Sequence, residues 1–238
     1  GLGEFEYGSV LTFYPGDGDS MDAFTSRQTG TVAGEVWSSL YGGAGTNSSS
    51  SATSWYPDVN SGTVTDQWYI IYRILLLFDT STLGSGSTVT SADMEFVSQS
   101  VYESFTGRSV RMVTSNPDSN TAIVDADYDY TLWGSVAQAP DKLLSSITTD
   151  SSTYNSYALN ATGLGNISKT ATTKFGLRID SDANNSPPTW ASDKAAYAQV
   201  ASSNTTLPGD KRPRLVVTYT PPPASAAITG TIGDGATE

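Results

Sequence analysis

Three aspartates at alternate positions, Asp125, Asp127 and Asp129, are the residues of this sequence best placed to bind a metal ion. On a β-strand, alternate side chains project to the same face, so these carboxylates would lie together, and loop carbonyls could complete a calcium shell. The EF-hand pattern does not fit, because its sixth and twelfth positions would be Tyr130 and Val136 instead of Gly and Glu. A structural calcium at these residues therefore stands beside a simpler alternative, an acidic surface in contact with water.

Aromatic side chains suggest a second kind of site, a stacking platform for sugars. Trp55, Tyr56 and Trp190 lie in loop-rich stretches, which favours their exposure. The flat apolar face of such a ring matches the apolar face of a pyranose. The alternative is that these rings are buried in the core or at an interface, as aromatic residues beside strands usually are.

The sequence contains no His and no Cys, which limits the chemistry more than any motif does. Nucleophile systems of the Ser-His-Asp or Cys-His kind and zinc sites of the usual His/Cys type are excluded. A glycosidase would need two carboxyl groups about 5–10 Å apart, and no motif selects such a pair among the 24 acidic residues. We therefore expect no enzymatic activity and no cofactor other than the calcium considered above.

The net charge limits the partners. Lys and Arg number 12 against 24 for Asp and Glu, which gives a net charge of −12. A chain of this charge is repelled by phosphate backbones, so nucleic acid is not an expected partner. No apolar run approaches the roughly eighteen residues that span a bilayer, so membrane insertion is not expected either.

Hydrophobic patterning predicts an all-β protein. The segment 72–79 is apolar on both faces, as in a central strand that is covered on both sides. In 88–97, Ala92, Met94 and Phe96 alternate with acidic residues, which is typical of a half-buried strand. Further strands are expected at 5–14, 68–78, 108–113, 154–159, 174–180, 195–201 and 211–219.

These short strands, separated by Gly, Pro and Asp turns, predict a jelly-roll-like antiparallel β-sandwich with long loops. The sandwich should occupy residues 1–220, of which 1–67 are loop-rich and 41–51 form a surface loop. The Pro run that begins at 221 ends the domain, so 221–238 are expected to form a linker and the start of a further module or an interchain arm.

Two arginines are expected to have structural roles. Arg73 lies inside the apolar strand and must find carboxylates or carbonyls there, with Asp79 or Glu95 as candidate partners. Arg212 precedes Pro213 at the start of the closing strand.

The aliphatic strand that ends in Phe78-Asp79, the link 80–92 and the closing segment 212–219 resemble the disaggregatase-related (DNRLRE-type) β-sandwich modules. The resemblance covers about 13–219, and it departs from the family pattern at the Gly, Ser and Thr-rich stretch 42–54. Such modules occur in secreted and surface polysaccharide-associated proteins and in virion proteins of environmental phages. The segments 158–170 and 174–178 are similar to phage-associated members.

The resemblance implies a non-catalytic structural or adhesive module on the outside of a particle or cell. We expect a virion surface protein, such as a decoration, fibre or tail component, whose partners are other copies of itself or other surface proteins. The alternative is a carbohydrate-binding module of a secreted or cell-surface polysaccharide-processing protein. Both alternatives place the protein outside the cell or on the virion surface.

Overall fold

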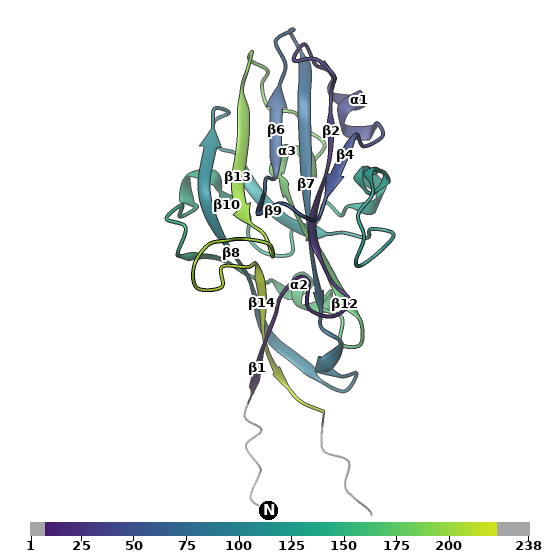
Figure 1. Ribbon diagram of the computed structural model, residues 1–238, viewed down its shortest axis with the longest axis vertical. Helices are drawn as coiled ribbons and strands as arrows, with labels where there is room; N and C mark the ends of the chain where they lie inside the picture. Colours follow the sequence, from purple (N-terminus) through teal and green to yellow (C-terminus); the bar gives the residue numbers. More distant parts are fainter. Residues whose placement is uncertain (1–7, 223–238) are drawn as a thin grey trace, which may run out of the picture.

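The computed structural model describes residues 8–222, which fold into one network of antiparallel strands with a few short helices (Figure 1). The strands are β1 (Ser9–Phe13), β2 (Asp22–Gln28), β3 (Glu35–Val36), β4 (Asn47–Ser49), β5 (Ser54–Trp55), β6 (Asp58–Ser61), β7 (Gln67–Asp79), β8 (Thr88–Glu103), β9 (Ser109–Thr114), β10 (Lys142–Leu143), β11 (Tyr154–Ala158), β12 (Thr172–Ile179), β13 (Ala195–Ala201) and β14 (Arg214–Thr220). The helices are α1 (Trp37–Gly42), α2 (Ala161–Gly165) and α3 (Asp180–Ala183), and single 3-10 turns are η1 (Ser81–Leu83), η2 (Asp125–Tyr128), η3 (Tyr130–Leu132) and η4 (Leu144–Ser146).

Strand β7 is the centre of the fold, and the sheet forks along it. One edge of β7 pairs with β2. The other edge pairs first with β6, opposite Trp68 to Tyr72, and then with β12, opposite Ile74 to Asp79. One branch therefore continues from β6 through β13 to β8, and the other continues from β12 through β9 to β10.

Strand β8 closes the sandwich, because its two halves belong to different sheets. Its first half pairs with β14 and β11, and its second half pairs with β13. Strand β14 in turn pairs with β1, with Ser9 opposite Tyr219. The two ends of the described chain consequently leave the sandwich side by side (Figure 1). They lie at the end of the molecule opposite the last residues of β6 and the first residues of β13.

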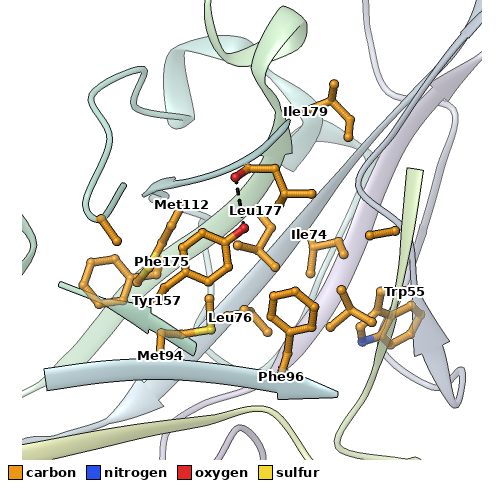
Figure 2. Close-up of a cluster of buried hydrophobic side chains, with 14 of the residues drawn as sticks. Trp55, Ile74, Leu76, Met94, Phe96, Met112, Tyr157, Phe175, Leu177 and Ile179 are labelled. Carbon is orange, nitrogen blue, oxygen red and sulfur yellow. Dashed lines mark hydrogen bonds between the residues drawn. The ribbon is translucent and has the colours of Figure 1, made fainter. Parts of the chain in front are cut away.

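The main core lies between the two branches and beneath the first half of β8. Its buried side chains come from every wall, as Figure 2 shows for Ile74, Leu76, Phe96, Phe175 and Leu177. All these side chains are fully buried because each strand sends alternate residues inward. The prediction of an all-β antiparallel sandwich is confirmed, including the inward faces of β8 and β12 and the double burial of the 72–79 strand.

The opposite face of β7 and β12 is covered by the irregular segment 115–134 and by α3. Leu75 and Leu77 pack there with Trp133 in a smaller apolar cluster. Beside them, Arg73 and Arg178 share the carboxylate of Asp182, and all three side chains are 0–1% exposed. This covering layer explains how a strand can be apolar on both of its faces.

The buried ion cluster corrects the expected partners of Arg73. Neither Asp79 nor Glu95 contacts its guanidinium; Asp182 accepts from Arg73 Nη2 at 2.8 Å and from Arg178 Nε at 2.6 Å. Burial alone would raise the pKa of Asp182, but the two guanidinium groups outweigh it and hold that pKa below its usual value. Glu95 pairs instead with Arg214.

The first third of the chain is more ordered than its composition suggests. The stretch 41–51, expected to be a surface loop, contains β4, which pairs with β2. Of the expected linker 221–238, all but its first two residues lie outside the described residues. Within 8–222, no helix has the length and apolar character needed to cross a membrane.

Candidate functional site

A row of directly opposed residues crosses the outer face of the β6–β13 branch. Tyr72 lies opposite Asp58, Asp58 opposite Tyr197, and Tyr197 opposite Tyr102. Opposed residues on neighbouring strands point to the same side of a sheet. Because the next residue of β6, Val59, points into the core, this row points outward.

Aromatic rings cover this side of the sheet, and we call Phe24, Tyr56, Tyr72, Tyr102 and Tyr197 the tyrosine face. The rings of Tyr102 and Tyr197 stack with centroids 5.7 Å apart, and Tyr56 meets Tyr197 edge-on at 5.6 Å. Phe24 contacts Tyr72 at 5.0 Å. Tyr102 is 47% exposed and the others are half-buried, so a partner can reach the rings without unfolding the sheet.

Asp58 lies beneath the rings at the centre of the tyrosine face. It is only 8% exposed, and its single side-chain hydrogen bond is from Asn60 Nδ2 to Oδ2 at 3.3 Å. Oδ1 is buried and accepts no hydrogen bond within the described residues. Burial raises the pKa of Asp58 to about 8, since no cation lies close enough to offset the loss of water. The carboxyl group is therefore mostly protonated at neutral pH.

A shallow pocket of about 200 Å³ adjoins the tyrosine face. Its wall includes Asn60, Tyr69, Asp193 and Lys194. The Oδ1 atom of Asn60 is buried and, within the described chain, accepts no hydrogen bond. The pocket wall thus combines an amide, a carboxylate, an ammonium group and a tyrosine, a combination that suits a small polar ligand.

The three aromatic residues predicted as a sugar platform do not come together. Trp55 is 1% exposed, which overturns its expected exposure; its Nε1 donates to the buried Asp22 at 3.0 Å, and burial raises the pKa of that carboxyl. Trp190 is half-buried against the core and donates to the carbonyl of Gln67. Tyr56 alone belongs to the tyrosine face.

The three alternating aspartates also do not converge, because 125–128 form the 3-10 turn η2 in place of a strand. Asp125 accepts a hydrogen bond from the Ser48 hydroxyl. Asp129 accepts the backbone N–H of Thr131 and so caps η3. Asp127 is buried and accepts the backbone N–H groups of residues 118 and 124. Over residues 8–222, no three His, Cys, Asp or Glu side chains are grouped closely enough to hold a metal ion.

Apart from Tyr56, the residues of the tyrosine face were not predicted from the sequence, although two signals were present. The triplet Asp58-Val59-Asn60 alternates polar and apolar residues, which is typical of a strand with one outward face. Tyr72 interrupts the apolar run of β7, where it is half-buried between fully buried neighbours. The ion cluster had no comparable signal, because Arg178 lies on β12 and Asp182 in α3, so their spacing of four is not the spacing of neighbours on one helix.

The comparisons with known proteins add no family. No protein-family model matches the chain, and no curated protein is significantly similar to it. The function is therefore inferred from the geometry of the site and from the sequence resemblance described above.

Proposed function

We propose that this protein is a non-catalytic structural or adhesive module at the surface of a particle, most fittingly a virion, where it serves as a decoration, fibre or tail component. In this proposal the module is anchored at the β1–β14 end and contacts its partner through the tyrosine face. It acts outside the cell or on the virion surface, and its partners are other copies of itself or other surface proteins.

The observation that carries the proposal is the tyrosine face itself. Tyrosine is enriched in protein interfaces because its ring buries a large area at a low cost in side-chain entropy. Its hydroxyl can also hydrogen-bond to water at the solvent-accessible edge of the interface. The face is formed by β2, β7, β6, β13 and the second half of β8, away from the paired ends of β1 and β14 (Figure 1). A module attached at that end presents these rings outward.

The test is the mass of the native protein in solution, measured by light scattering. We expect a discrete oligomer that dissociates when Tyr102, which is 47% exposed, is changed to Ala. Tyr130→Ala is the matched control, because Tyr130 is 43% exposed but lies on η3, outside the tyrosine face. If both variants keep the wild-type mass, or if the wild type is a monomer at all concentrations, assembly through this face is rejected.

The alternative proposal is a carbohydrate-binding module, and one observation favours it. Asn60, Tyr69 and Asp193 line the pocket beside the tyrosine face, where a sugar could form hydrogen bonds with polar side chains while its ring stacks on a tyrosine. A glycan array distinguishes the two proposals. Retention of a glycan by a monomer, lost in Tyr197→Ala and kept in Tyr130→Ala, would replace the assembly proposal with this one.

A further inference from the structure

We infer that a second pocket, on the turn between β8 and β9, is a binding site for an oxoanion, either a sulfate or a carboxylate group. The pocket has a volume of about 300 Å³ and includes Phe105, Thr106, Arg108, Pro188, Thr189 and Lys194 in its wall. This inference goes beyond the proposed function and does not depend on it.

The first observation is the unusual state of Arg108. Its guanidinium donates no hydrogen bond within the described chain, whereas every other arginine donates at least one. Arg108 Nη1 lies 3.3 Å from Asp180, and its Nε is buried without an acceptor. A guanidinium group has five N–H donors in a planar fork that fits an oxoanion in a bidentate manner. Most of the donors of Arg108 are thus left for a ligand.

The second observation is Lys194, which contributes to the wall of the same pocket. Lys194 Nζ has neither a salt bridge nor a hydrogen bond to any residue within 8–222. Two cations that share one wall repel each other unless an anion lies between them. Of the nearby carboxylates, Glu103 accepts the backbone N–H of Arg108, and Asp180 accepts the backbone N–H of Ser109.

The third observation is that the backbone around the pocket is held in place. The Ser61 hydroxyl accepts from the N–H of Lys194 at 2.8 Å and donates to the carbonyl of Ala191. On the other side, Ser104 Oγ accepts from the N–H of Ala195 at 2.9 Å. The backbone that carries Lys194 is therefore held in place, which reduces the entropy lost on binding. Hydroxyls of Thr106 and Thr189 are available to complete the shell.

The charge, the donor set and the size of the pocket together define the ligand. A volume near the lower limit for ligand pockets, about 300 Å³, holds one anionic group with a small part of its carrier. The same oxoanion could be a free inorganic ion or a substituent of an acidic sugar polymer. The experiment below separates these two sources.

The test is a titration followed by ¹⁵N–¹H NMR, with sodium sulfate added at constant ionic strength and sodium chloride as the reference. We expect saturable shifts of the Arg108 Nε–H signal and of the amides of 104–108 and 189–194, with a Kd in the millimolar range. Arg108→Gln and Lys194→Gln should each weaken binding at least tenfold. Lys174→Gln is the control, because Lys174 also forms no ion pair with any residue of 8–222 but lies on β12 outside the pocket.

The outcomes are distinguishable. Shifts that rise linearly without saturation, or that are unchanged in both pocket variants, overturn the site. If Arg108→Gln is unfolded, Lys194→Gln decides alone, since its ammonium contacts no described carboxylate. A sulfated oligosaccharide and its desulfated counterpart give the source: tighter binding of the sulfated form than of inorganic sulfate identifies a polymer substituent, and equal or weaker binding identifies the free ion.

Discussion

Asp182 and Arg73 are 109 residues apart in the sequence, yet Oδ1 of the first lies 2.8 Å from Nη2 of the second, and both side chains are 0% exposed. The contact joins the short helix that follows β12 to the central strand. Arg178 completes the cluster, and the carbonyls of residues 41 and 128 accept further guanidinium hydrogen bonds. The covering layer over β7 is therefore attached to the sheet by charge as well as by apolar packing.

The first prediction concerns the loss of that charge. Asp182→Asn leaves two buried guanidinium groups without a counter-charge, so the free energy of unfolding should fall by about 3–5 kcal/mol. Urea denaturation measures the change. Asp141→Asn is the control, because Asp141 pairs with Arg111 in a partly exposed position and should cost about 1 kcal/mol or less. Equal losses in the two variants would contradict a special role for the buried cluster.

The second prediction is a pH dependence that originates at Asp58. Its pKa is about 8 in the folded state and about 4 in the unfolded chain, so the folded state binds the additional proton between these values. Stability should therefore decrease as the pH rises from about 4 to 8, and level off above that range. Asp58→Asn should remove the part of this decrease that Asp58 causes, and leave the part that Asp22 causes, because burial raises the pKa of Asp22 as well.

Urea midpoints at pH 5, 7 and 9 test the Asp58 prediction. The matched control is Asp193→Asn on the exposed surface, at a left-handed backbone position (φ 56°) that Asn also tolerates. The control should keep the wild-type pH profile. A pH profile of Asp58→Asn that parallels the wild type would show that another group causes the dependence.

The third prediction concerns close packing at Gly176. A Cβ atom there would lie 2.5 Å from Trp133 Cζ3 and 2.7 Å from the Ile74 carbonyl oxygen, and the backbone of β7 cannot yield. Gly176→Ala should therefore destabilise the protein by about 1–3 kcal/mol, with a loss of near-ultraviolet circular dichroism from Trp133. Gly165→Ala in α2, where a Cβ meets no atom within 4 Å, should be neutral or stabilising. A stable Gly176→Ala protein would mean that the covering layer is loosely packed.

The fourth prediction separates the structural role of Asp127 from a metal-binding role. Asp127→Ala leaves two backbone N–H groups without their acceptor, at a cost of about 1–3 kcal/mol. Calcium chloride and a chelator should each leave the wild-type melting temperature unchanged, because both carboxylate oxygens of Asp127 are already occupied. A calcium-dependent rise in the wild type that is absent in Asp127→Ala would restore the calcium hypothesis.

The sequence predicted the strands whose patterns depend on local alternation. In β8 and β12, Met94, Phe96, Phe175 and Leu177 point inward as expected, because a half-buried strand must place alternate residues in the core. Strand β13 was expected at 195–201 and is observed there. The polar strands β2 and β4 were not predicted, because they lack an alternating apolar pattern. They form because β2 pairs with β7 and β4 pairs with β2.

The candidate sites could not be predicted, because they depend on pairing register and on contacts between distant residues. The tyrosine face exists only because the register of β6, β7, β13 and β8 aligns Tyr72, Asp58, Tyr197 and Tyr102. Trp55 follows a low-complexity stretch and looked exposed, but its indole binds Asp22, which lies on a strand that the sequence did not indicate. Arg108 and Lys194 line the same pocket although they are 86 positions apart, and no local sequence pattern at either residue indicates this.

The pairing of β1 with β14 also has a mechanical consequence. A pull on both ends of the described chain would open this ladder one hydrogen bond at a time, because Ser9 and Tyr219 are neighbours at the same end. A pull between the tyrosine face and the end of β14 instead runs along β8 and β14, and the hydrogen bonds of that antiparallel pair share the load in shear. The fold therefore resists force best in the direction in which an anchored module would be stretched by its partner.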